Sequence, residues 1–302
     1  MRASATTGGK RPASAREPAR LLLLFVDGLG LAPPGPGNPV SRAVCPALAG
    51  FLAEARPLDA TLGVPGLPQS ATGQTALLTG INAAALMGRH VVGFPNRALA
   101  KLIEERNLLL LLRQAGYAAV FANAYYADNI GMVRHARRKS ATTVAALSGG
   151  GRVRLAEDML RGMAVCHDIT RATLRARGYD GPLIEPETAA DHLLGVAMKN
   201  DFTMFEHFLA DRAGHARCQQ TAEAVLADYD RFLARLLEQA DETGATLMLT
   251  SDHGNIENLS CGAHTLNPVP WAVAGPDRTA LLDGPRDLTD VAPLLRNHVA
   301  KG

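Results

Sequence analysis

The chain has 302 residues, of which 47% are hydrophobic and 20% are charged, and its formal net charge is +2. A chain of this length and composition can bury a full apolar core, which excludes a disordered protein and predicts one large α/β domain with room for an insertion. The balanced charge and the lack of any nucleic-acid motif in the sequence argue against a nucleic-acid partner.

Residues 1–20 are rich in Ala, Ser and Arg, and we interpret them as a disordered leader. The apolar residues 21–26 are too few for a signal peptide, and no segment of the sequence has transmembrane length, so no membrane association is expected. The four cysteines are far apart and form no Cys-x-x-Cys pair, which is typical of a reducing compartment. The sequence therefore predicts a cytoplasmic protein, and it leaves the oligomeric state open.

Apolar segments typical of buried strands alternate with helical patterns along the chain. The predicted strands cover residues 21–26, 117–122, 202–209, 245–250 and 269–274. The predicted helices include residues 98–114, 221–239 and 287–299. Because strands alternate with helices, we predict a doubly wound, mostly parallel sheet flanked by helices, built from residues 21–125 and 200–300.

The pattern changes between residues 126 and 199, where short helical pieces surround Gly149-Gly150-Gly151, and we interpret this segment as a small inserted cap. Residues 128–180 contain ten Lys or Arg against five Asp or Glu, a local net charge of +5. A solvated helix face explains such a run, but a basic excess beside an active site also favours an anionic substrate. The candidate anion-binding residues are Arg134, Arg137, Arg138 and Arg152.

Asp252 and His253 follow the predicted strand 245–250, and His264 comes eleven residues after His253. The carboxyl ends of strands are where open α/β sheets bind ligands. One carboxylate and two imidazoles suit zinc or manganese, so these residues are candidate metal ligands. A hydrogen-bonded turn is the alternative interpretation of an Asp-His pair at a strand end.

Other candidates lie at comparable places. Asp27 ends the strand 21–26, and Gly28-Leu29-Gly30 lacks the third glycine of a dinucleotide loop. Asp211 and His215 follow the strand 202–209, and two residues four apart share one face of a helix. Ser70 and Thr72 precede an apolar helical segment. Taken singly, these residues also fit a turn, a surface pair and a helix cap.

Taken together, these candidate residues occur in the same order along the chain as in the alkaline phosphatase superfamily. The sequence resembles in particular the metalloenzyme branch, which includes the cofactor-independent phosphoglycerate mutases and phosphopentomutases. The resemblance covers most of residues 21–300 and is most specific in Asp252-His253-Gly254-Asn255-Ile256-Glu257 and in the segment from His264 to Pro270. It implies two divalent metal ions, Mn²⁺ or Zn²⁺. One would be held by Asp211, His215 and His264, and the other by Asp27, Asp252 and His253 with the oxygen of the nucleophile.

The resemblance also implies which residue is the nucleophile. Two different motif spacings of the superfamily, when placed on this sequence, both point to Ser70, and Thr72 is the fallback. A serine hydroxyl is a weak nucleophile at neutral pH and needs a cation to stabilise its alkoxide. Sulfatases require a Pro and an Arg where this chain has Thr72 and Gln74, which disfavours a sulfatase. The mutases have a His at the position of Gln74 and a much larger second domain.

These features predict a di-metal phosphoryl-transfer enzyme that hydrolyses a small phosphate ester or phosphonate through a phosphoserine intermediate. Two alternatives stay open at this point. One is a phosphomutase of the phosphoglycerate mutase or phosphopentomutase type, in which the phosphoryl group returns to the substrate. The other is a catalytically silent metal-binding protein.

Overall fold

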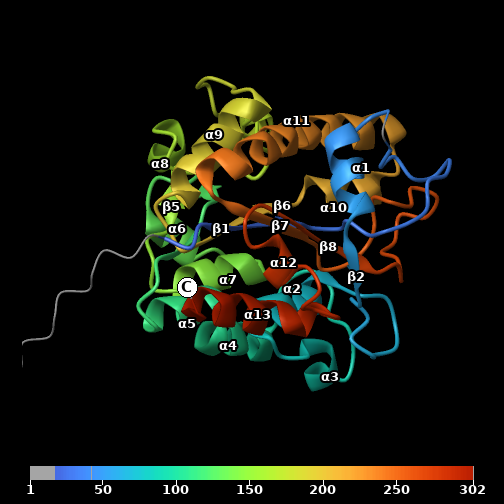
Figure 1. Ribbon diagram of the computed structural model, residues 1–302, viewed down its shortest axis with the longest axis horizontal. Coiled ribbons are helices and arrows are strands. Elements are labelled where there is room, and N and C mark those ends of the chain that lie inside the picture. The colour runs from blue at the N-terminus through green and yellow to red at the C-terminus, as the bar shows by residue number, and fades with distance from the viewer. Residues whose placement is uncertain (1–17, 42, 302) are drawn as a thin grey trace, which may run out of the picture.

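The computed structural model describes residues 18–41 and 43–301, so almost all of the predicted leader lies outside the described residues. A six-stranded sheet forms the centre of the molecule, with the strand order β2-β8-β7-β1-β6-β3 (Figure 1). Its strands are β1 (Leu21–Val26), β2 (Arg56–Leu58), β3 (Ala119–Phe121), β6 (Phe202–His207), β7 (Thr246–Thr250) and β8 (Val269–Ala274).

The sheet is mixed, because one of its edges is antiparallel. Strands β7, β1, β6 and β3 are parallel to one another, whereas β8 pairs antiparallel with β7 and β2 pairs antiparallel with β8. The predicted mostly parallel α/β sheet is therefore confirmed. The short strand β2 was not predicted, because three residues that include Pro57 carry no strand pattern.

Helices cover both faces of the sheet (Figure 1). One layer contains α2 (Ser70–Thr79), α3 (Ala83–Met87), α4 (Arg97–Arg106), α5 (Leu108–Gln114), α7 (Ala141–Ser148), α12 (Arg278–Leu281) and α13 (Leu288–Lys301). The other contains α1 (Pro46–Ala53), α9 (Pro186–Ala197), α10 (Leu209–Ala216) and α11 (Gln219–Thr243). Alternate residues of β1 pack into the two opposite cores, which is why its sequence is apolar throughout.

Two predicted elements differ from the structure. The predicted helix 98–114 is two helices, because Asn107 adopts an extended backbone and its side chain accepts a hydrogen bond from the Leu110 amide, which caps α5. The predicted strand 202–209 ends at His207, and α10 begins at Leu209. This early end places Asp211 and His215 on a helix.

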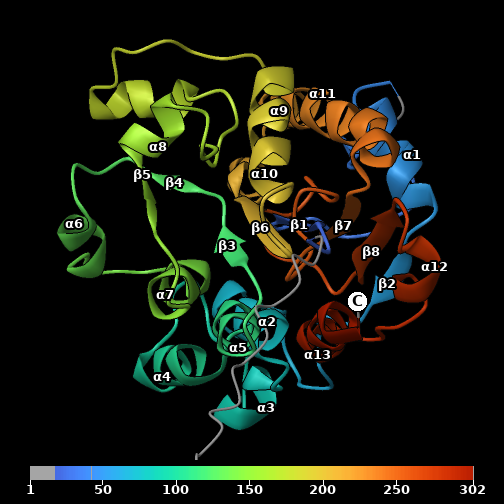
Figure 2. The same ribbon diagram turned by 60° about the vertical axis from the view of Figure 1, so that its left-hand side comes forward.

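Parts of the segment 126–199 belong to the layers just described, since α7 and α9 pack on opposite faces of the sheet. The remainder lies beyond β3, as Figure 2 shows, with its own small apolar cluster around Met159 and Tyr179. Its elements are β5 (Arg154–Leu155), which pairs with β4 (Ala124–Tyr125), α6 (Ile130–Arg134), α8 (Ala156–Leu160) and the 3-10 helix η1 (Ala172–Arg177). The division into core and cap stays a prediction.

Over residues 18–41 and 43–301, no helix combines the length and the apolar character that are needed to cross a membrane.

Candidate metal centre and its cavity

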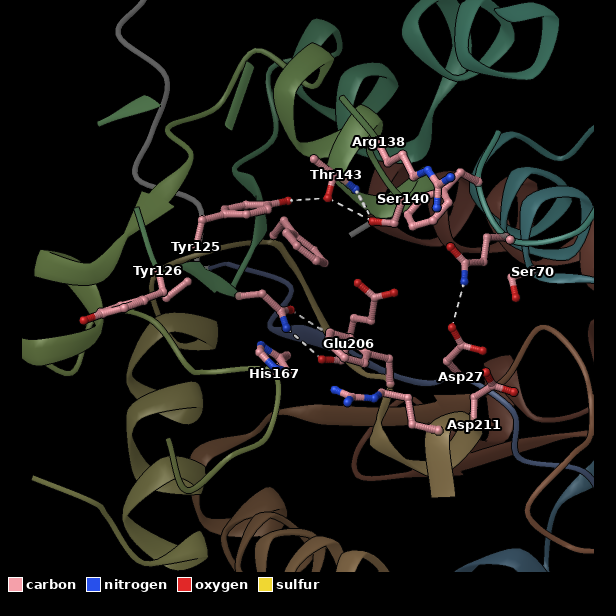
Figure 3. A pocket seen from close by; sticks show the side chains of 18 of the residues that line it. Asp27, Ser70, Tyr125, Tyr126, Arg138, Ser140, Thr143, His167, Glu206 and Asp211 are labelled. Atoms are coloured by element: carbon pink, nitrogen blue, oxygen red, sulfur yellow. Dashed lines mark hydrogen bonds between the residues drawn. The ribbon is translucent and has the colours of Figure 1, made fainter. Parts of the chain in front are cut away.

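The candidate metal ligands converge at the carboxyl ends of the parallel strands. Asp27 follows β1, Asp252 and His253 follow β7, and α10, which carries Asp211 and His215, follows β6. Neighbouring parallel strands end at the same edge of a sheet, so residues far apart in the sequence meet there. Figure 3 shows Asp27, Ser70 and Asp211 together at one end of a cavity.

The first cluster consists of Asp27, Asp252 and His253, which each offer one ligand atom within 4.8 Å of the others. His253 Nε2 lies 3.3 Å from Asp27 Oδ1 and 3.5 Å from Asp252 Oδ2. Ser70 Oγ lies 3.0 Å from the same nitrogen. The hydroxyl that is the candidate nucleophile therefore borders directly on this cluster.

The second cluster adjoins the first. Asp211, His253 and His264 offer ligand atoms within 4.8 Å of one another, and the rings of His253 and His264 stack at 3.6 Å. His215 joins them, since its Nε2 lies 3.4 Å from Asp211 Oδ2 and 3.2 Å from His264 Nε2. The structure thus brings together all seven residues that were predicted to surround the two ions.

The hydrogen bonds of His215 and His264 determine which nitrogen of each ring directs a lone pair toward the cluster. His264 Nδ1 lies 2.7 Å from the carbonyl oxygen of Pro68, and His215 Nδ1 lies 2.8 Å from that of Gly262. A carbonyl oxygen can only accept, so each Nδ1 carries the proton in the neutral ring. The two Nε2 lone pairs then face each other and Asp211, an arrangement that a cation between them would stabilise.

The first cluster concentrates buried negative charge that a bound cation would compensate. Burial, and then the nearby carboxylates, raise the pKa of Asp27 well above its usual value, and burial raises that of Asp252 to about 7. Burial and the neighbouring His264 lower the pKa of His253 to about 3, so its imidazole is the neutral, ligating form. Asp27 Oδ1 is buried without a hydrogen-bond partner. This donor set fits a divalent cation such as Zn²⁺ or Mn²⁺.

Neighbouring side chains hold the candidate ligands in place. Gln74 Nε2 donates to Asp27 Oδ2 and to Asp252 Oδ2, at 3.1 Å each. Asn255 Nδ2 donates to Asp211 Oδ1 at 2.6 Å. Glu257 in turn accepts from the backbone amide of Asn255 at 2.7 Å, which explains the spacing of the Asp-His-Gly-Asn-x-Glu motif.

Two glycines allow the surrounding backbone to approach this closely. Gly28 has φ +77°, and a Cβ added there would lie 2.7 Å from the Cβ of Asp211. A Cβ on Gly73 would lie 2.7 Å from the carbonyl oxygen of Asp252, so only glycine lets α2 pack against the end of β7. This contact positions Ser70 beside His253.

The two candidate nucleophiles differ in where their hydroxyl groups point. Ser70 is the first residue of α2, lines the cavity and contacts His253. Thr72 is fully buried, and its hydroxyl donates to the carbonyl oxygen of Gln69 at 3.1 Å and accepts from the Val91 amide at 3.3 Å. The geometry therefore favours Ser70 over Thr72.

The cavity beside the clusters has a volume of about 640 Å³. Of the four arginines proposed to bind an anion, Arg138 lines it, together with Arg177 and Arg212. Arg152 instead pairs with Asp158 at 2.6 Å, and Arg134 and Arg137 are not among the lining residues. The exposed positive charge that borders the cavity thus comes largely from arginines that the sequence did not single out.

Glu206 is a buried lining residue that the sequence analysis missed. Burial raises its pKa to about 7, and Thr142 Oγ1 donates to its carboxylate at 2.6 Å. A carboxylate inside the apolar strand 202–207 was the signal that could have identified it, because unpaired acids are rarely buried. The lining residues Tyr125, Tyr126 and His167 gave no such signal.

Comparison with known proteins finds one matching family model and relatives that match part of the chain. The model of the Metalloenzyme superfamily matches residues 19–299. A 2,3-bisphosphoglycerate-independent phosphoglycerate mutase of Clostridioides difficile is 31% identical over 127 residues, which are 37% of this chain and 25% of that protein. One of Cereibacter sphaeroides is 33% identical over 124 residues, 37% of this chain and 24% of that protein. The matched part thus spans about a quarter of the length of these relatives.

Solved structures show the same fold at low sequence identity. Alkaline phosphatase from the Antarctic bacterium TAB5 superposes with a TM-score of 0.53 and 15% identity, covering 95% of this chain and 99% of that one. The 2-O GAG sulfatase BT1596 superposes with a TM-score of 0.51 and 11% identity, covering 94% of this chain and 71% of that one.

Proposed function

The chain belongs to the Metalloenzyme superfamily, and from this premise we propose that it is a di-metal phosphoryl-transfer enzyme with Ser70 as its nucleophile. One observation carries the proposal: Ser70 Oγ lies 3.0 Å from His253 Nε2, beside two clusters of carboxylates and imidazoles, and faces a cavity. The named activity of the curated relatives, phosphoglycerate mutase, supports phosphoryl transfer as the reaction type.

Two divalent cations would be held by two sets of side chains, Asp211, His215 and His264 on one side and Asp27, Asp252 and His253 on the other. When bound, they would supply positive charge for the serine alkoxide and for the oxygens of the transferring group. Zn²⁺ and Mn²⁺ both suit this donor set.

The residues of the chain would then act as follows. Ser70 Oγ loses its proton and forms a bond to phosphorus, while the bond from phosphorus to the oxygen of the leaving group breaks and that oxygen takes up a proton, which yields phosphoserine and the free alcohol. Water hydrolyses the phosphoserine and releases inorganic phosphate. Gln74 keeps Asp27 and Asp252 oriented through its two hydrogen bonds. Arg138, Arg177 and Arg212 attract the anionic ester toward the cavity.

Hydrolysis is our first proposal, and the phosphomutase is the second candidate because the curated relatives are mutases. A mutase must keep the phosphoserine from water while the substrate reorients, which needs an enclosing domain. Here Arg138 and Phe94, both on the cavity wall, are exposed residues, and Gln74 stands where the mutases have a histidine. These features support a reaction in which water reaches the intermediate.

We therefore expect the metal-loaded enzyme to release inorganic phosphate and free alcohol from a phosphate ester. Conversion of 3-phosphoglycerate to 2-phosphoglycerate, and of ribose 1-phosphate to ribose 5-phosphate, should be undetectable. A phosphate assay run beside chromatography of the sugar and glycerate phosphates measures both reactions. Quantitative isomerisation without phosphate release would overturn the hydrolase and establish the mutase.

Arg138 and its neighbour Arg137 provide a matched test of anion attraction, because both are exposed and only Arg138 lines the cavity. We expect Arg138→Gln to raise KM roughly tenfold and to change kcat much less, since a charge that only gathers the substrate acts on binding. Arg137→Gln should leave both constants near their wild-type values. If the two substitutions change KM equally, the position of Arg138 in the cavity wall does not contribute to attracting the substrate.

A further inference from the structure

Aromatic side chains are concentrated in the cavity beside the metal centre. The chain has 8 Phe, 5 Tyr and 1 Trp, and five of these 14 residues line this one cavity. They are Phe94, Phe121, Tyr125, Tyr126 and Phe208. In a protein with only 5% aromatic residues, such a concentration in the cavity that Ser70 lines indicates that the cavity binds more than a phosphate group.

The rings are held in fixed orientations. His167, which also lines the cavity, stacks on Phe208 with ring centroids 4.3 Å apart and an interplanar angle of 11°. Tyr126 packs edge-on against Tyr179 at 5.8 Å. The hydroxyl of Tyr125 donates to Thr143 Oγ1 at 3.1 Å. Rings fixed in this way present flat surfaces to a ligand without a large loss of side-chain entropy on binding.

Two of the cavity's arginines reinforce these surfaces. The guanidinium of Arg177 lies 5.4 Å from the ring centre of Tyr126, and that of Arg138 lies 5.7 Å from the ring centre of Phe94. Within the described ranges, neither arginine forms an ion pair with a carboxylate. Guanidinium groups stack on planar rings as well as attracting anions, so they add to the affinity for a flat, electron-rich group.

The arrangement separates the two kinds of group along the cavity. Figure 3 shows Ser70, Asp27 and Asp211 at one end, and Tyr125, Tyr126 and His167 toward the other, with Glu206 between them. A volume of about 640 Å³ lies within the range of sites for ligands of drug size, of which a phosphoglycerate would fill only part.

We propose that the aromatic end of this cavity binds a planar aromatic or heteroaromatic group, so that the substrate is a phosphomonoester that carries such a ring. The inference rests on the proposed function, because it places the phosphate at Ser70 and the ring against Tyr126, His167 and Phe208. The ester of a nucleoside has this chemistry: a phosphate, a polar spacer and a flat base.

The test compares two esters of the 5′-hydroxyl of ribose, adenosine 5′-monophosphate and ribose 5-phosphate, on enzyme loaded with Mn²⁺. Only the base differs, so the ratio of their kcat/KM values measures what the base contributes to binding. Stacking of one base on aromatic side chains predicts a preference for the nucleotide on the order of tenfold to a hundredfold. A ratio near one, with both esters hydrolysed, would overturn this inference and leave the proposed function intact.

Ring-removing variants locate the contact. Tyr126→Leu and His167→Leu should each lower the nucleotide preference several-fold, mainly by raising KM for the nucleotide, while kcat/KM for ribose 5-phosphate stays near its wild-type value. Tyr117→Leu is the control, since Tyr117 is partly buried and lies outside the cavity lining. A preference that survives both cavity substitutions would contradict the proposed position of the ring.

Binding measurements keep the inference separate from catalysis. Calorimetry with Mn²⁺-loaded Ser70→Ala protein should show tighter binding of the nucleotide than of ribose 5-phosphate by a similar factor. If neither ester is hydrolysed by the wild type while this difference in binding persists, the proposed function fails, and of the inference only the binding of a planar ring at the aromatic end stands. Equal binding of the two ligands would overturn the inference whatever the rates are.

Discussion

Replacing Ser70 with alanine should lower kcat for phosphoester hydrolysis by roughly three orders of magnitude or more, because the substitution removes the atom that forms the covalent intermediate. Metal content should largely survive, since each cluster keeps three protein side chains. Elemental analysis of the purified variant, beside steady-state kinetics, measures both quantities. Mass spectrometry of acid-quenched wild-type enzyme should find a phosphate on the peptide that contains Ser70.

Thr72→Ala provides the matched control two residues away. The Thr72 hydroxyl is used in hydrogen bonds to the backbone at Gln69 and Val91, so its removal should affect stability more than turnover. If Thr72→Ala is inactive and Ser70→Ala is not, Thr72 is the nucleophile. If wild-type enzyme binds metal but hydrolyses and isomerises no ester, the catalytically silent metal-binding protein becomes the correct interpretation.

The second prediction is that Asp252→Asn has opposite effects on metal binding and on the stability of the metal-free protein. The substitution removes a charged ligand from the first cluster, so metal content should fall and turnover should drop by about three orders of magnitude. In protein stripped of metal by a chelator, the same substitution should raise the melting temperature at about pH 8, because it removes a buried negative charge beside Asp27.

The sign of the pH dependence follows from the direction of the shift. Burial raises the pKa of Asp252 to about 7 in the folded protein, above its value in the unfolded chain. Between roughly pH 4 and pH 7 the folded state therefore binds more protons, and the stability of the metal-free protein falls as the pH rises through this window. The stabilisation by Asp252→Asn should be small near pH 5 and reach a few kcal/mol near pH 8.

Thermal unfolding of chelator-treated wild type and variant at these two pH values measures the effect. Glu242→Gln, an exposed carboxylate on α11, is the control and should change neither metal content nor the pH dependence. A metal-free Asp252→Asn protein that is less stable than wild type at about pH 8 would show that hydrogen bonds to the carboxylate outweigh its burial as a charge.

Short-range patterns in the sequence predicted the strands at whose ends the candidate ligands lie. The apolar segments at 21–26 and 245–250 predicted strands, with Asp27 and Asp252 just beyond their carboxyl ends, and the family resemblance implied that these two residues hold one metal ion. The strand prediction worked because a strand's position in the sheet and the position of its carboxyl end both follow from local hydrophobicity and from parallel pairing.

Other features of the site depend on contacts between residues far apart in the sequence. Whether Ser70 or Thr72 faces His253 depends on the rotation of α2, which Gly73 sets by packing on the carbonyl of Asp252. The hydrophobic pattern of α2 does not show this contact, and the sequence selected Ser70 only through the family resemblance. The orientation of a side chain at the start of a helix follows from what the helix packs against.

Only the tertiary structure showed which side chains line the cavity. Arg138 borders it and Arg137 does not, although the two are adjacent in one basic run, and Arg152 pairs with Asp158 instead. Tyr126 and His167 reach the same space from different elements. A cavity wall is assembled from single side chains of many segments, and each contributes without a repeating pattern. The sequence therefore determines which strand ends carry the candidate ligands, while the packing of distant segments determines which side chains line the cavity beside them.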